Sequence, residues 1–228
     1  MTAKKYIVAL LLSQLGVKTF AQQVFVSHDV IKANGLTLTY ICNDKTFSLV
    51  TKQRLVDAFF KVYPPEVKRF NTYAATEVIF DVDTNYKGVA ATSNAHVRFN
   101  PVWFVKHSED IDVVTHEVMH IVQNYGGNHV PGWLTEGIAD YARYTFGINN
   151  EAAGWKLTDY KPSQNYTNAY RITARFLVWT EKHKQQPNLV NQLDQAMRAG
   201  TYTPDLWKQL TGKTVDELWA DYTADPTI

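Results

Sequence analysis

The chain has one cysteine, Cys42, among its 228 residues. A single thiol excludes an intramolecular disulfide, so the fold depends on a hydrophobic core rather than on cross-links. The charge is nearly balanced, with 23 Lys and Arg against 22 Asp and Glu. No long basic run occurs, which argues against a nucleic-acid partner. Internal repeats, low-complexity tracts and interdomain linkers are also missing, and these absences predict one globular domain.

The N-terminus lacks an apolar run long enough to cross a bilayer. It does contain a short basic region at Lys4-Lys5, an apolar stretch over residues 6–12 and a small-residue cleavage sequence. This order is typical of a secretory signal peptide. We therefore expect residues 1–21 to be a signal peptide. Residues 22–228 would form the mature single domain, which would be secreted or periplasmic, without stable membrane association and monomeric by default.

The stretch that carries chemistry begins with H-E-V-M-H at residues 116–120. Apolar residues recur around it at spacings of three and four, which predicts an amphipathic helix that ends at the glycine pair 126–127. Positions four apart share a helix face, so His116 and His120 can reach one metal ion. Glu117 lies beside them, where a base can take a proton from a metal-bound water.

A third metal ligand is expected downstream, because a catalytic zinc site takes three protein ligands and keeps one position open. A second helix that starts near Trp133 would run back antiparallel to the first. On it, Glu136 is the leading candidate and Asp140 the second, and His129 ranks third. Asp140 lies one turn after Glu136, where it can instead accept the spare N–H of a ligating histidine. The two acids differ by one helical turn, so spacing alone separates them poorly.

The two motifs together resemble those of gluzincin metallopeptidases, and more closely those of the basic secretory protein family of plants and bacteria. The core of that family is similar to V-T-H-E-x-x-H-x-x-Q followed by P-G-W-L-x-E-G-I-A-D-Y-x-R. Residues 115–123 and 131–143 reproduce the two halves. The resemblance implies a Zn²⁺-dependent peptidase of zincin-like fold with a peptide or protein substrate. It also implies Glu136 as the third zinc ligand and Asp140 as the residue that orients a zinc histidine.

A tyrosine is the remaining element that the resemblance implies. Gluzincins of the aminopeptidase type place one at the start of a later helix, where its hydroxyl donates to the oxyanion. Here a polar loop over residues 147–168 is followed by a helix that is predicted to begin near Asn165. The resemblance therefore implies Tyr166 as a catalytic residue, with Tyr170 as the alternative. Either tyrosine could equally be a packed aromatic residue.

Around these motifs, the pattern predicts an α+β fold. A small mixed or antiparallel sheet would pack on the H-E-x-x-H helix, and a mostly helical C-terminal part would follow. Ser108 or Asp110 is the expected cap of the H-E-x-x-H helix. The expected elements are strands at 36–41 and 76–83, a short hairpin or two edge strands over 89–99, a helix at 48–62 ended by Pro64-Pro65, and C-terminal helices at 189–197, 204–210 and after Thr214. The resemblance to zincins implies that residues 89–99 form the cleft wall and pair with an extended substrate.

The function that fits these expectations is that of a secreted zinc metallopeptidase with Glu117 as general base. The competing class is a secreted defence-associated or binding protein whose metal site is structural or vestigial. A structural site needs no base beside an open coordination position, so Glu117 favours the enzyme. No recognisable acidic motif for a substrate's free amine occurs. General peptide-cleft grounds favour an endopeptidase slightly, and an aminopeptidase stays the open alternative.

Overall fold

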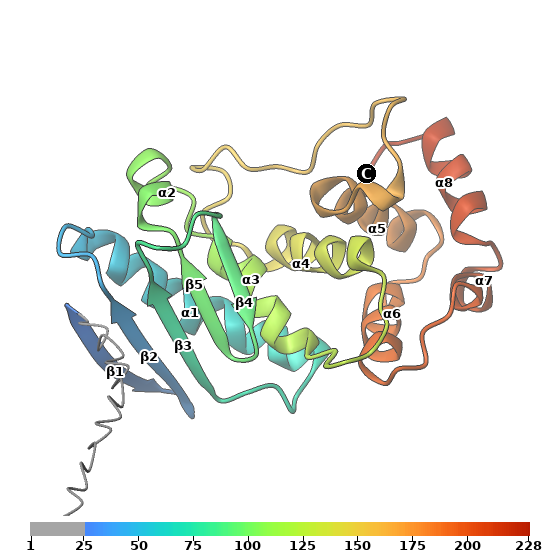
Figure 1. Cartoon of the computed structure of the whole chain (residues 1–228). Coiled ribbons are helices and arrows are strands. Elements are labelled where there is room, and N and C mark those ends of the chain that lie inside the picture. Colours follow the sequence, from blue (N-terminus) through green and yellow to red (C-terminus); the bar gives the residue numbers. More distant parts are fainter. Residues whose placement is uncertain (1–25) are drawn as a thin grey trace, which may run out of the picture.

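The computed structural model describes residues 26–228, so the expected signal peptide at 1–21 lies outside the described residues. A sheet occupies one side of the molecule and the C-terminal helices the other, with α3 and α4 between them (Figure 1). The predicted α+β class is thus confirmed. No helix within residues 26–228 is both long enough and apolar enough to cross a membrane.

The strands are β1 Ser27–Ala33, β2 Leu36–Cys42, β3 Glu77–Val82, β4 Ala90–Ser93 and β5 His96–Phe99. The helices are α1 Leu49–Phe70, α2 Pro101–Lys106, α3 Val113–Gln123, α4 Gly132–Phe146, η1 Tyr166–Asn168, α5 Tyr170–His183, α6 Leu189–Arg198, α7 Asp205–Thr211 and α8 Val215–Ala224.

The sheet is mixed and has the strand order β1-β2-β3-β5-β4. Its three middle strands are parallel, and the edge strands β1 and β4 pair antiparallel to their neighbours. Asn34 and Gly35 join β1 to β2, and both have positive φ, as a tight hairpin turn of two residues requires. The predicted strands and the hairpin over 89–99 are confirmed. This order leaves β4 at the edge of the sheet beside α3.

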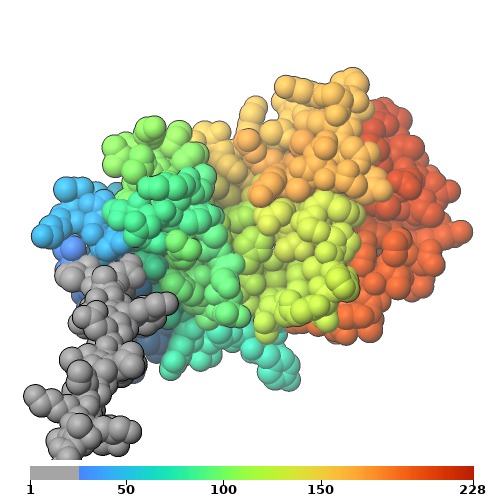
Figure 2. Space-filling view, in the orientation of Figure 1, coloured from blue at the N-terminus to red at the C-terminus, as the bar shows by residue number. Residues whose placement is uncertain are grey.

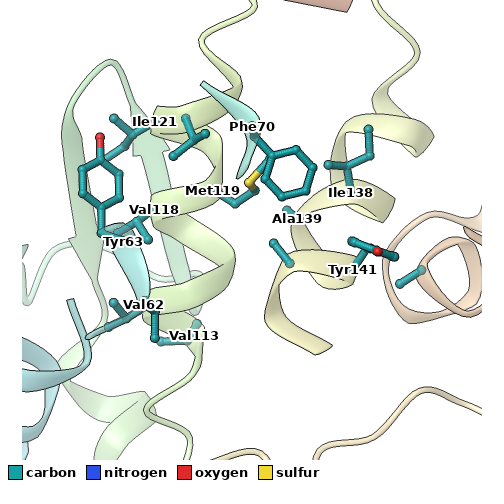
Figure 3. Close-up of a cluster of buried hydrophobic side chains, with 14 of the residues drawn as sticks. Val62, Tyr63, Phe70, Val113, Val118, Met119, Ile121, Ile138, Ala139 and Tyr141 are labelled. Atoms are coloured by element: carbon teal, nitrogen blue, oxygen red, sulfur yellow. The ribbon is translucent and has the colours of Figure 1, made fainter. Parts of the chain in front are cut away.

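The core that supports the metal-binding motif lies where α1, α3 and α4 meet (Figure 3). Helix α3 is the most deeply buried of the three, since nearly all its side chains are inaccessible to water. Burial on this scale stabilises the fold by roughly 25 cal/mol per Å² of apolar surface. The side chains that fill the contact are Val62, Tyr63 and Phe70 of α1, Val113, Val118, Met119 and Ile121 of α3, and Ile138, Ala139 and Tyr141 of α4.

Helix α1 extends beyond its predicted end and runs through Pro64 and Pro65 to Phe70. The prediction that the prolines end it is therefore wrong. Each proline removes a helical hydrogen bond, but tertiary packing on both sides compensates. The Tyr63 hydroxyl donates to the Ala75 carbonyl at 2.7 Å, and the ring of Phe70 packs edge-on against Phe146.

Helix α3 begins at Val113, later than the predicted caps, and neither Ser108 nor Asp110 caps it. Asp112 is the N-cap residue, but its carboxylate accepts from the backbone N–H groups of Ile148 and Asn149. This fully buried side chain therefore ties the start of α3 to the segment that follows α4. The acidic residues before the helix serve tertiary contacts, which a capping pattern in the sequence does not reveal.

Glu66 is a fully buried carboxyl group on α1, and neither of its oxygens has a hydrogen-bond partner among residues 26–228. Burial raises the pKa of Glu66 well above 4.5, and the charge of His116 lowers it only in part. The folded protein therefore holds a proton that the unfolded chain releases above about pH 4.5. This difference makes the free energy of unfolding fall as the pH rises from there toward the raised pKa.

We expect Glu66→Gln to increase stability above the acidic range, with a gain that grows by up to about 1.4 kcal/mol per pH unit. The neutral amide has nearly the same shape and does not ionise in the unfolded state. Urea denaturation between about pH 5 and pH 8 in the presence of a chelator measures this difference. Glu151→Gln, at an exposed position, is the control and should show no such growth. A gain that does not change with pH would contradict the assignment.

Candidate metal centre and cleft

A cleft of about 960 Å³ lies where the sheet edge meets the central helices. Strand β4 forms one wall, α3 and the first turns of α4 form the floor, and the start of α5 closes the other side. In Figure 2, the green surface of the β4–α2 region faces the orange surface of the segment that leads into α5. Trp155 and Gly154, from the loop after α4, also line the cleft. The loop predicted over 147–168 thus contributes to the wall.

The two histidines of α3 and Glu136 of α4 converge on one point in this cleft. The Nε2 atoms of His116 and His120 are 3.3 Å apart. Glu136 Oε2 lies 3.2 Å from the first of these atoms and 3.6 Å from the second. A tetrahedral zinc ion with bonds of about 2.0–2.1 Å separates its ligands by about 3.3 Å. The three donors therefore fit a zinc ion in both chemistry and spacing.

Each histidine uses its other ring nitrogen in a hydrogen bond that fixes the ring. His116 Nδ1 lies 2.7 Å from Asp140 Oδ1, as the sequence predicts for an orienting acid. His120 Nδ1 lies 2.7 Å from Gln123 Oε1, and the Gln123 amide donates to the Thr135 carbonyl of α4. Such contacts orient metal-ligating imidazoles. Sequence reasoning missed Gln123, although its position three residues after His120 places it on the same face of the helix.

The carboxylates control the protonation of these ligands. Burial lowers the pKa of His116, but its hydrogen bonds to Asp140 and Glu136 outweigh that effect and raise it to about 10. Burial raises the pKa of Glu136, whereas the hydrogen bonds from His116 and His120 outweigh it and hold the pKa well below the usual range. Glu136 is therefore ionised, which is the state in which a carboxylate binds a metal ion.

Glu117 lies at the cleft, almost fully buried, next to the ligand group. Its carboxylate accepts a hydrogen bond from the hydroxyl of Thr92, with Thr92 Oγ1 2.7 Å from Glu117 Oε2. The same Oγ1 atom lies 3.0 Å from the backbone carbonyl oxygen of Glu117. Edge strand β4 thus holds the candidate base from across the cleft. The sequence gives no signal for Thr92, because the contact depends on the strand order of the sheet.

The structure places the two alternative ligands away from the convergence point. His129 is exposed in the turn between α3 and α4 and does not line the cleft. Asp140 contacts the Nδ1 side of His116, on the ring edge opposite the Nε2 atoms that face Glu136. Of the three candidates for the third ligand, the geometry brings Glu136 together with both histidines.

The two candidate tyrosines lie in different surroundings. Tyr170 lines the cleft, and its ring stacks against that of His116 with centroids 6.1 Å apart. The Glu136 carboxylate and burial raise the pKa of Tyr170, so its hydroxyl stays protonated as a donor. Tyr166 is not part of the cleft lining and packs among aromatic side chains, and its hydroxyl donates to Asp216 at 2.7 Å. Burial and that hydrogen bond raise the pKa of Tyr166 to about 12.

The helix expected near Asn165 begins only at Tyr170, after the short 3-10 turn η1. Ala169 and Tyr170 both have positive φ, 63° and 51°. Non-glycine residues in this region cost on the order of 1–3 kcal/mol each and cluster at functional sites. Two such residues in succession turn the chain so that Tyr170 enters the cleft. Because neither residue is glycine, the sequence does not predict this turn.

A close approach of α4 and α5 brings Tyr170 near the candidate metal ligands. A Cβ atom on Gly137 would lie 2.2 Å from Thr173 Cγ2, far inside van der Waals contact. Only glycine at this position lets the two helices approach as they do. Gly137 is the glycine of the E-G-I-A-D segment that begins with Glu136. The close contact with Thr173 explains why this position holds glycine.

Comparison with known proteins identifies the chain's relatives. Residues 37–222 match the BSP family model, described as a peptidase of plants and bacteria. The fold is similar to that of Legionella pneumophila aminopeptidase A in complex with aspartic acid, with a TM-score of 0.60 and 12% identity over 85% of this chain and 27% of that chain. Matches with lower scores include an M1 zinc metallopeptidase from Deinococcus radiodurans, with a TM-score of 0.41 and 13% identity over 88% of this chain and 47% of that one.

A third solved structure, an aminopeptidase N family protein from Idiomarina loihiensis, matches with a TM-score of 0.42 and 16% identity over 86% of this chain and 41% of that one. This chain therefore spans less than half the length of each of these solved chains. No curated protein matches. At such low identity the likeness to the Legionella protein concerns the fold alone.

Proposed function

Since the chain belongs to the BSP family of plant and bacterial peptidases, we propose that it is a zinc-dependent peptidase that hydrolyses peptide bonds with water. The observation that carries the proposal is the convergence of His116, His120 and Glu136 on one point, with Glu117 beside it in the same cleft. We also propose that the protein is secreted or periplasmic, on the basis of the signal-peptide pattern in residues 1–21.

A zinc ion held by His116, His120 and Glu136 would polarise the scissile carbonyl and acidify the attacking water. Glu117 takes a proton from that water as its oxygen forms a bond to the carbonyl carbon. The same carboxyl group passes the proton to the leaving nitrogen when the carbon–nitrogen bond breaks. The products are a new carboxylate and a new amine. Thr92 holds the Glu117 carboxylate in place throughout, because its hydroxyl donates to one of the two oxygens.

Tyr170 is the residue that we propose for the developing oxyanion, in preference to Tyr166. Its protonated hydroxyl is free of a hydrogen bond to any other residue within 26–228, whereas that of Tyr166 is engaged by Asp216. A hydroxyl group in the cleft that has no other acceptor can donate a hydrogen bond to the carbonyl oxygen and stabilise the negative charge that forms there. Asp140 and Gln123 hold the two imidazoles in orientation while this occurs.

Substrate would bind as an extended strand along β4. This strand pairs with β5 on one side only, and its residues 90–92, together with the preceding Val89, line the cleft. Main-chain hydrogen bonds to a free sheet edge are a common way to bind a peptide. This wall carries no acidic side chain that could bind a free amine, which favours cleavage inside a chain over removal of its first residue.

Hydrolysis of an internally quenched peptide library by the purified, zinc-loaded protein tests the proposal. We expect cleavage that a chelator abolishes and added zinc restores. Mass spectrometry of the products identifies the cleavage sites and separates internal cleavage from stepwise removal of N-terminal residues. If the folded, zinc-loaded protein cleaves no peptide in the library, the peptidase assignment is overturned in favour of a binding protein.

The two tyrosines are compared in the same assay. We expect Tyr170→Phe to lower kcat by about 10²–10³-fold, which is the typical loss when an oxyanion donor is removed. Tyr166→Phe should leave kcat nearly unchanged and lower the free energy of unfolding by about 1 kcal/mol, because it loses the bond to Asp216. The reverse pattern would identify Tyr166 as the catalytic tyrosine.

A further inference from the structure

Arg171 differs from the other arginines of the described chain because it has no partner. It is exposed and lines the cleft, and its side chain makes no hydrogen bond or ion pair within residues 26–228. A guanidinium group that is free in a cleft is available to a ligand. The other arginines in this range all form ion pairs with carboxylates, namely Arg54, Arg69, Arg98, Arg143, Arg175 and Arg198.

The acidic residues of the cleft are already engaged. Asp110 pairs with Arg143, and Glu117 accepts from Thr92. The remaining two acids, Glu136 and Asp140, face the zinc-site histidines. None of the four carboxylates that line the cleft therefore pairs with Arg171, whose guanidinium group is left for a ligand.

The position of Arg171 relates this charge to the reaction. Arg171 directly follows Tyr170 on the first turn of α5, and both side chains line the same cleft. The guanidinium group is thus anchored one residue from the proposed oxyanion donor. A group that it binds would lie close to the scissile bond rather than at a remote part of the substrate.

We propose that Arg171 binds a carboxylate of the substrate and makes the enzyme selective for acidic peptides. A guanidinium group presents a planar fork of donors that matches a carboxylate with two parallel hydrogen bonds. The carboxylate can come from an aspartate or glutamate side chain next to the scissile bond, or from the C-terminus of a short peptide. This inference rests on the proposed peptidase function, since it assigns the substrate class of the same cleft.

The test measures binding apart from turnover. Fluorescent peptides with glutamate next to the cleavage site are compared with their glutamine counterparts, all with amidated C-termini. A third set carries glutamine and a free C-terminus. Binding is measured by anisotropy with the zinc-loaded Glu117→Gln protein, in which peptides stay intact. In this background we compare Arg171 with Arg171→Gln, and use Lys182→Gln as the control, because Lys182 is an exposed cation on the same helix outside the cleft.

We expect the glutamate peptide to bind about 10- to 100-fold more tightly than its glutamine counterpart, as for a hydrogen bond to a charged group. Arg171→Gln should remove this preference and Lys182→Gln should keep it. A preference for the free C-terminus instead, also lost in Arg171→Gln, would identify the terminal carboxylate as the bound group. Equal binding of all three sets, or a preference that survives Arg171→Gln, would overturn the inference.

The same peptides given to the zinc-loaded wild-type protein separate this inference from the proposed function. Hydrolysis without preference for a carboxylate would overturn the role of Arg171 and leave the peptidase intact. Selective binding without hydrolysis of any peptide would overturn the peptidase and leave Arg171 as the carboxylate-binding residue of a binding protein.

Discussion

Replacement of Glu117 by glutamine is expected to lower kcat by about 10²–10⁴-fold, the range of a general base in proton transfer. The substitution preserves the shape of the side chain. The Thr92 hydroxyl can still donate to the amide oxygen of Gln, so the side chain should keep its place. What is lost is the ability to take a proton from water. The zinc content should remain that of the wild type, because Glu117 is not among the converging ligand atoms.

Two measurements on the same preparation make this prediction decisive. Peptide turnover gives kcat, and mass spectrometry of the metal gives the zinc bound per chain. Glu77→Gln, at an exposed position on β3, is the control and should change neither quantity. Normal turnover by the Glu117→Gln protein would exclude Glu117 as the base. Loss of zinc together with turnover would instead give it a role in metal binding.

Replacement of Glu136 by alanine is expected to weaken zinc binding by more than about 100-fold. Removal of a hydrogen-bond partner of a ligand, as in Asp140→Asn, typically costs about 10- to 100-fold, and loss of a direct ligand should exceed that. The side chain of Glu136 is 30% exposed, so its truncation should not unfold the protein. Competition with a chelating dye measures the affinity, and the free energy of unfolding of the apo forms verifies that the variant is folded.

His129→Ala completes the comparison, because His129 is the ligand candidate that lies outside the convergence point. It should bind zinc as the wild type does. If His129→Ala loses zinc while Glu136→Ala keeps it, the ligand set is wrong. A greater loss in Asp140→Asn than in Glu136→Ala would move the third ligand to Asp140.

Local pattern in the sequence was sufficient for the elements that carry the candidate metal site. The spacing of His116 and His120 needs only a helix, and the predicted helix is present as α3. The second helix, with Glu136 just after its first turn, followed from the turn residues before it. Four of the five strands lie within or close to the predicted stretches, whereas β1, Ser27–Ala33, was not predicted. In each case the information resides in neighbours along the chain.

The features that were missed or misjudged depend on contacts between distant segments. Helix α1 passes through Pro64 and Pro65 because its far end is buried against other elements. Thr92 meets Glu117 only because β4 is the strand at the sheet edge next to α3. Tyr170 enters the cleft through two left-handed residues that are not glycine. Residue propensities and hydrophobic periodicity describe neighbours along the chain, so they do not predict contacts between distant segments from a single sequence.

The hydrogen bond between Thr92 and Glu117 links the binding of a peptide along β4 to the orientation of the candidate base. The strand that orients the base is the one along which we propose that the peptide aligns. A peptide paired correctly with β4 would steady that strand and hold the carboxylate toward the attacking water. A peptide shifted by one residue along the edge would present its main-chain groups out of register with those of β4 and would not hold the strand in this way. Proton transfer by Glu117 would then depend on how the main chain of the substrate pairs with β4, a requirement that is the same whatever side chains the substrate carries.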